Sequence, residues 1–203
     1  MKRRGRSGLA SRADLKDEVR VLGVDDSPFT FDDDRSLLLG VVARLPGYVE
    51  GVLSAPVKVD GDDATAAIAK MVSQSRFVKQ VRCVMLDSPC MAGFNVVDMD
   101  ALHSETGIPV MSVSRDEPDF VKIEAALRKH FDDWEKRLAL LKGPVWKTRS
   151  VARPVFVSAH GIERHEAERL IALSIVRGAI PEPIRLAHII GSGIARGESR
   201  GPA

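Results

Sequence analysis

The stretch VRVLGVDDSPF, Val19–Phe29, is a short apolar run that ends in two adjacent aspartates. The run Val19–Val24 is rich in β-branched residues, which predicts a buried strand. Asp25 and Asp26 follow it directly. Aspartate is common in turns, so this pair either begins an ordinary acidic turn or places carboxylates at a strand end where a site can form. The rest of the sequence is needed to distinguish a turn from a site.

Two further extended segments follow this strand. Ser36–Leu45 is an apolar run, and Tyr48–Asp60 continues with β-branched residues and some alternation after Pro46 and Gly47. Two extended runs joined by a Pro-Gly turn predict a hairpin. The beginning of the chain therefore predicts three consecutive strands, each antiparallel to the next.

The pattern then alternates between helices and strands. In residues 62–72, Ile68, Met71 and Val72 share one helical face behind Asp62 or Asp63 as the N-cap. The later segments predict strands at 80–86, 108–115 and 154–159, and helices at 98–107, 116–138, 163–178 and 181–190. This order predicts one α/β domain over residues 17–195, with a mixed sheet flanked by helices. Residues 1–16 are expected to be a disordered basic arm, and residues 196–203 a flexible tail.

The composition is that of a globular protein, with 203 residues of which 44% are hydrophobic and 29% charged. No apolar run approaches the roughly 20 residues that cross a bilayer, and the N-terminus lacks the apolar segment of a signal peptide. A cytoplasmic protein with no membrane partner is therefore expected. Cys83 and Cys90 have no metal-binding spacing and are expected to be reduced.

The net charge of +2 gives no overall electrostatic argument for nucleic acid. The charge is uneven, however, because residues 1–12 hold five basic residues and no acidic residue. Such an arm either contacts phosphates or only keeps the protein soluble.

A second aspartate, Asp87, ends the strand expected at 80–86, as Asp25 ends the first strand. Side chains at the carboxyl ends of neighbouring strands converge in the crevice where α/β sheets usually bind ligands. Two carboxylates in that position are hard oxygen ligands for Mg²⁺ or Mn²⁺. The alternative is that each aspartate only caps a turn. Asp26 either joins the ligands or points back into its turn.

Five segments in the same order resemble one known family: VLGVDDSPF, YVEGVLSAPVKVDGDDAT, VMLDSPCMAGFNVVD, TGIPVMSVSR and IPEPIRLAHIIGSGI. Together they are similar to the archaeal endonuclease dU family, which is related to endonuclease V. The resemblance covers about residues 17 to 201. It implies an RNase H-like fold, which is a mixed five-stranded sheet whose first three strands are antiparallel.

The resemblance also implies a metal site. Endonuclease V has three acids, of which Asp25 matches the first by position and Asp87 the last. Asp60, which precedes a glycine, is the best match for the middle acid, and Asp63 is the other candidate. The implied cofactor is Mg²⁺ or Mn²⁺. Arg115 stands where endonuclease V has a lysine, and arginine stabilises phosphate charge but cannot act as a base.

Three residues are expected to contact nucleic acid. Tyr48, the only tyrosine, is placed by the resemblance where endonuclease V has a wedge that opens the duplex. Phe94 and Asn95, in the segment after Asp87, are candidates to stack on a base and to hydrogen-bond its edge. His160 lies near the position of an endonuclease V histidine. His188 is expected to be a structural histidine on an apolar helix.

The resemblance, with these residues, implies a divalent-metal-dependent endonuclease that cleaves nucleic acid containing deaminated bases, uracil or hypoxanthine, in DNA repair, with DNA favoured over RNA as partner. The alternative is a non-catalytic nucleic-acid-binding protein on the same fold. A third reading, a phosphoacceptor receiver domain, is disfavoured because two further strands precede the first helix after Asp26.

Overall fold

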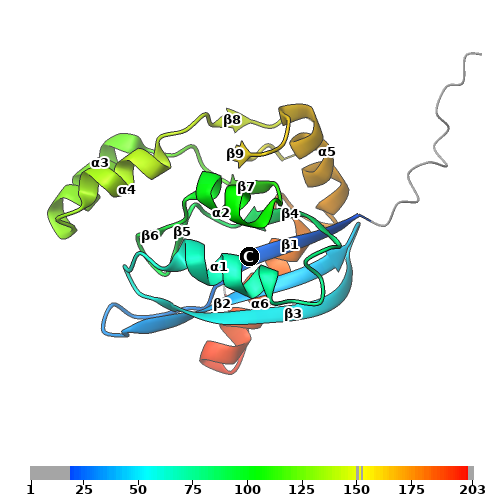
Figure 1. Ribbon diagram of the computed structural model, residues 1–203, viewed down its shortest axis with the longest axis horizontal. Coiled ribbons are helices and arrows are strands. Elements are labelled where there is room, and N and C mark those ends of the chain that lie inside the picture. The colour runs from blue at the N-terminus through cyan, green and yellow to red at the C-terminus, as the bar shows by residue number, and fades with distance from the viewer. Residues whose placement is uncertain (1–18, 150, 152, 201–203) are drawn as a thin grey trace, which may run out of the picture.

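The computed structural model describes residues 19–149, 151 and 153–200. The expected basic arm at 1–16 lies outside these residues, as do the last three residues of the expected tail. The described chain folds into a twisted sheet with helices on both faces (Figure 1). No helix in this part of the chain is long and apolar enough to cross a membrane.

The first three strands are antiparallel, as the sequence predicts. β1 (Arg20–Asp26) pairs with β2 (Arg35–Arg44), and β2 pairs with β3 (Tyr48–Lys58). On its other side β1 runs parallel to β4 (Val81–Leu86), which is parallel in turn to β7 (Val110–Ser114). The carboxyl ends of β1, β4 and β7 therefore meet at one edge of the sheet.

The sheet has seven strands, in the order β3-β2-β1-β4-β7-β9-β8, and not the five expected. β9 (Phe156–His160) pairs antiparallel with β7, and the two-residue β8 (Trp146–Lys147) pairs with β9. Without β9, the buried strand β7 would expose a row of unpaired backbone groups. A separate small hairpin, β5 (Cys90–Met91) with β6 (Asn95–Val96), lies in the segment that follows Asp87.

Of the six helices in the described residues, four cover the two faces of the sheet. On one face lie α1 (Ala64–Ser73) and α2 (Met99–Thr106), which share a buried apolar cluster with alternate residues of β1, β2 and β4. On the other face lie α5 (Arg164–Ser174) and α6 (Glu182–Arg196). Figure 1 shows α1 and α2 in front of the sheet and α6 behind it. Burial of apolar surface between these layers supplies the main stabilisation of the fold.

The single helix expected over 116–138 is two helices, α3 (Phe120–His130) and α4 (Trp134–Leu141). The break falls at Phe131, whose backbone is extended (φ −135°, ψ 128°). Two aspartates follow it, and aspartate competes with helix through its own backbone hydrogen bonds. The break turns the Phe131 ring onto Phe94, with the ring centroids 5.8 Å apart.

The last helix begins with proline in its first turn, as predicted, but it extends further than expected, through Gly191 to Arg196. Within the expected tail, the Ser199 hydroxyl donates to the Ile189 carbonyl at 2.9 Å. The helix crosses β1 at Gly23, where an added Cβ would lie 2.3 Å from the carbonyl carbon of Pro183. Only glycine allows α6 to approach β1 this closely.

Candidate acidic site

The structure brings Asp25 and Asp87 to the same edge of the sheet. Val24 is in register with Leu86 across the parallel pair β1–β4, so each aspartate is the next residue along its strand. The backbone N–H of Asp87 donates to the Val24 carbonyl at 3.1 Å. Asp25 is buried, with 6% of its surface exposed. These two acids thus lie close together because β1 and β4 pair in parallel.

Side-chain alternation separates Asp26 from this pair. Gly23 faces α6, and Val24 faces the cluster formed with α1 and α2. Since side chains alternate between the faces of a strand, Asp25 points toward α6 and Asp26 toward the opposite face. There the nearby Ala92 backbone N–H lowers the pKa of Asp26 and opposes the effect of burial.

The three acids carry more negative charge than their surroundings neutralise. Burial raises the pKa of Asp25 to about 8, and the charges of Asp87 and Asp26 add to the effect. Burial also raises the pKa of Asp26 to about 6. The pKa of Asp87 is raised by burial as well, although Arg115 and His188 oppose the shift. Such a set of carboxylates is stabilised in its ionised form by a cation.

His188 is a member of this site that the sequence did not reveal. Its Nδ1 atom lies 2.9 Å from Oδ2 of Asp25, and the hydrogen bond joins α6 to β1. The expectation of a structural histidine rested on the apolar neighbours of His188. The available signal was its spacing: His188 lies four residues after Ile184, whose backbone sits against Gly23, and residues four apart share a helix face.

Arg115 follows β7 and lies beside Asp87. Both line a hollow of about 250 Å³, together with Val113, Ser114, Asp116 and Ile180. Arg115 is exposed and lowers the pKa of both Asp25 and Asp87 through its charge. The hollow therefore offers a cation beside the acids, at the strand ends where a phosphate can enter.

The two candidates for the middle acid, Asp60 and Asp63, are engaged in hydrogen bonds with other parts of the chain. Oδ1 of Asp60 accepts from the Phe94 N–H at 2.7 Å. Oδ1 of Asp63 accepts from the Lys58 N–H at 3.1 Å and from the Asn95 amide at 2.7 Å. Within the described residues, no group of three or more His, Cys, Asp or Glu side chains is placed to hold a metal ion. The three-acid arrangement that the resemblance implies is therefore not assembled.

The donor set nevertheless fits one divalent cation. Mg²⁺ commonly takes one or two protein carboxylates and completes its shell with water and substrate phosphate. Asp25 and Asp87 supply two such carboxylates, and their raised pKa values mark a site where positive charge is favoured. These two acids would hold Mg²⁺ or Mn²⁺.

Of the expected nucleic-acid contacts, Asn95 is fully buried. Its amide nitrogen donates to the Lys58 carbonyl and to Asp63, and its oxygen accepts from the Ala64 N–H. The side chain thus joins two loops and has no free edge for a base. Phe94 is half-buried against Phe131.

Tyr48 is exposed but lies at the wrong end of the sheet for the expected wedge. It pairs with Arg44, which pairs with Arg20 at the start of β1. Asp25 is five positions further along this strand, about 17 Å away at roughly 3.3 Å per residue. Figure 1 shows the β2–β3 turn at the right of the view, where β1 begins. His160 is also outside the site, with Nδ1 3.7 Å from Oδ1 of Asp100.

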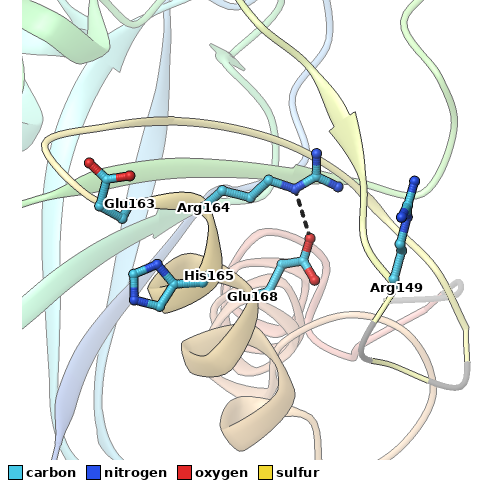
Figure 2. A pocket seen from close by; sticks show the side chains of 5 residues that line it. All are labelled: Arg149, Glu163, Arg164, His165 and Glu168. Carbon is cyan, nitrogen blue, oxygen red and sulfur yellow. Dashed lines mark hydrogen bonds and ion pairs between the residues drawn. The ribbon is translucent and has the colours of Figure 1, made fainter.

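A larger hollow, of about 460 Å³, lies at the start of α5 and shares no residue with the hollow at Asp87. Figure 2 shows Arg164 turned toward Glu168, with which it pairs at 3.0 Å, while Arg149 stands apart. Glu163 and His165 complete the lining. Because its two glutamates offset its cations, this hollow has no clear charge preference, and the acidic site at Asp25 remains the candidate for chemistry.

The chain belongs to the endonuclease dU family, whose model matches residues 17–195. Membership in this family identifies the class of protein as a nuclease. Proteins with similar sequences are found in archaea. A UPF0215 protein of Methanothermobacter thermautotrophicus is 44% identical over 93% of this chain and 94% of its own length. Another, from Methanosarcina acetivorans, is 44% identical over 93% of this chain and 97% of its own length.

Solved structures share the fold of this chain. A protein of unknown function from Archaeoglobus fulgidus is 34% identical, with a TM-score of 0.77 over 87% of this chain and 98% of that one. The catalytic domain of human endonuclease V is 20% identical, with a TM-score of 0.57 over 90% and 85% of the two chains. Endonuclease V of Ciona intestinalis, in complex with DNA containing an inosine, has a TM-score of 0.54 at 16% identity, over 83% and 82%. The last two likenesses show that the fold is shared with endonuclease V.

Proposed function

We propose that this protein is a divalent-metal-dependent endonuclease that hydrolyses a phosphodiester bond in nucleic acid containing a deaminated base, uracil or hypoxanthine. DNA is favoured over RNA as the substrate, and repair of deaminated DNA is the proposed role. The observation that carries the proposal is the meeting of Asp25, Asp87, His188 and Arg115 at one sheet edge. The DNA bound to Ciona endonuclease V supports nucleic acid as the partner.

In the proposed reaction, Asp25 and Asp87 would hold Mg²⁺ or Mn²⁺. When bound, the divalent ion supplies Lewis-acid stabilisation of the negative charge that develops on the phosphate. Side chains of the protein bind the phosphate and orient the acids. The exposed guanidinium of Arg115 binds a phosphate oxygen beside Asp87 and stabilises charge without taking a proton. His188 orients Asp25 through the 2.9 Å hydrogen bond.

His188 is also suited to move a proton. An imidazole has two ring nitrogens that can exchange protons, and this one is partly exposed, with 31% of its side chain accessible. Hydrolysis adds water across the P–O bond, so one proton leaves the attacking water and the departing oxygen gains one. A histidine at the edge of the site can exchange such a proton with solvent.

A non-catalytic nucleic-acid-binding protein is the second candidate. The observation that favours it is the engagement of Asp60 and Asp63 in internal hydrogen bonds, which leaves two acids at the strand ends. A binder would use Arg115 for phosphate contact and would need no metal.

One panel of substrates separates the two candidates. The protein is incubated with DNA and RNA oligonucleotides that contain uracil, hypoxanthine or only normal bases, with Mg²⁺, Mn²⁺ or EDTA. The enzyme is expected to nick a deaminated strand with metal and not with EDTA, and Asp25→Asn is expected to abolish the nick. Binding without cleavage across the whole panel would overturn the enzyme proposal and favour the binder.

A further inference from the structure

Arg137 on α4 is a nearly buried cation that contacts two loops distant in sequence. Its Nη1 atom donates to the Gly61 carbonyl at 2.7 Å and to the Phe94 carbonyl at 2.6 Å. Its Nε atom donates to Asp133 at 2.8 Å, and its guanidinium carbon lies 4.3 Å from the centroid of the Phe131 ring. Because the side chain is only 11% exposed, these contacts replace its hydration.

The two loops that Arg137 contacts are also joined to each other. Oδ1 of Asp60 accepts from the Phe94 N–H at 2.7 Å, and the Asp60 N–H donates to the Ala92 carbonyl at 2.8 Å. Asp60 and Ala92 both have positive φ, at 52° and 44°. Non-glycine residues hold such a backbone only where their surroundings enforce it. At Gly93 an added Cβ would lie 2.2 Å from Oδ1 of Asp60, so the junction is also closely packed.

This junction adjoins the acidic site along the chain, because β5 begins at Cys90, three residues after Asp87. A continuous series of hydrogen bonds runs from Arg137 through Phe94 and Asp60 to Ala92 in this segment. The Ala92 backbone N–H also lowers the pKa of Asp26, which burial raises. Figure 1 shows α3 and α4 at the end of the molecule where β5 and β6 lie.

We propose that Arg137 is a positioning residue, which fixes the 90–96 segment and thereby helps to hold Asp87, which lies just before this segment, in place at the acidic site. Arg137 does not line the hollow at Asp87, and it acts only through the loop junction. The same geometry gives Asp60 a different role from that of a metal ligand, because its carboxylate is the acceptor that binds the two loops together. The inference rests on the proposed function for its activity measurement alone.

The test compares Arg137→Gln with Arg128→Gln. Arg128 is a matched control, because its guanidinium also lies over an aromatic ring, at 4.1 Å from Trp134, and pairs with Glu124, but no contact joins it to the loops. Amide hydrogen exchange is followed across residues 58–63 and 90–96, and kcat and KM are measured on a deaminated oligonucleotide. Arg137→Lys keeps the charge but replaces the planar guanidinium by a single ammonium group, and it serves as the conservative variant.

Arg137→Gln is expected to speed exchange in residues 90–96 and to lower kcat by about tenfold or more, as small misplacements of reacting groups do. KM is expected to change by less than about threefold, because Arg115 is untouched, and Arg137→Lys is expected to recover part of kcat. Unchanged exchange in residues 90–96 would overturn the inference. So would faster exchange with a kcat equal to that of Arg128→Gln. If the wild-type protein cleaves nothing, the proposed function fails, and the exchange measurement alone still decides whether Arg137 holds the loop.

Discussion

The Nδ1 atom of His188 lies 2.9 Å from Oδ2 of Asp25, although the two residues are 163 positions apart. The contact joins the last helix to the first strand, at the edge where Asp87 and Arg115 also lie. The carboxylate is buried, while the imidazole is partly exposed. The buried acid is thus hydrogen-bonded to an imidazole that reaches solvent.

Replacing His188 by alanine is expected to lower kcat by about a hundredfold, the usual loss when a proton-transferring group is removed. The control is His165→Ala, because His165 is exposed on α5 and lines the separate hollow in Figure 2. Cleavage rates of both variants are measured at saturating substrate and Mn²⁺. Retention of more than a third of wild-type kcat in His188→Ala would remove His188 from the mechanism.

Metal binding should depend on Asp25 and Asp87 and not on Asp60. Calorimetric titration with Mn²⁺ is expected to give a dissociation constant at least about tenfold weaker for Asp25→Asn and Asp87→Asn, since each loses a charged ligand. Asp60→Asn is expected to keep the wild-type constant, because its carboxylate is engaged with the Phe94 N–H. Loss of Mn²⁺ binding in Asp60→Asn alone would contradict this assignment.

Without metal, the protein is expected to lose stability as pH rises. Burial, with the charges of Asp87 and Asp26, raises the pKa of Asp25 from 3.8 to about 8. Between these values the folded state binds the extra proton, so the free energy of unfolding falls with increasing pH and levels off above pH 8. Asp25→Asn removes this penalty, which is on the order of a few kcal/mol.

The measurement is urea unfolding in EDTA at pH 5.5 and pH 8.5. Asp25→Asn is expected to be more stable than the wild type at pH 8.5 and closer to it at pH 5.5. Asp32→Asn, in an exposed loop, serves as the control and should follow the wild type at both values. A wild-type stability that rises between the two pH values would show that Asp25 is not the dominant titrating group.

The sequence was sufficient to predict which residues lie at the ends of strands. It was not sufficient where the position of a residue depends on the direction of its side chain or on a tertiary contact. Asp25, Asp87 and Arg115 follow apolar runs, so parallel pairing alone brings them to one edge. Spacing singled out Asp60 as an acid before glycine, but it could not show that the carboxylate turns to the Phe94 N–H. His188 depends on how α6 crosses β1, which no local pattern contains.

Tyr48 is expected to be dispensable for cleavage, because the β2–β3 turn lies at the opposite end of β1 from Asp25. Tyr48→Ala should keep kcat/KM within about twofold of the wild type, as is usual for a surface change away from a site. The comparison uses a duplex and a single-stranded oligonucleotide with the same deaminated base. A loss confined to the duplex would restore the wedge role and require the substrate to reach across the sheet.

Gly23 is expected to control the position of His188. Gly23→Ala would place a Cβ 2.3 Å from the carbonyl carbon of Pro183, and backbone at that distance cannot move aside as a side chain can. The helix α6 must shift away from β1, which is expected to cost about 1–3 kcal/mol of stability and to break the His188–Asp25 hydrogen bond. The activity loss should approach that of His188→Ala, although His188 itself is intact.

Gly143→Ala is the matched control, because its Cβ would meet only the Ser158 hydroxyl oxygen, at 3.7 Å. Both variants are compared by thermal unfolding and by cleavage well below their melting temperatures. The double variant Gly23→Ala/His188→Ala tests the coupling directly: if Gly23 acts through His188, the two losses in kcat should not add. Additive losses would mean that Gly23 supports the fold without setting the histidine.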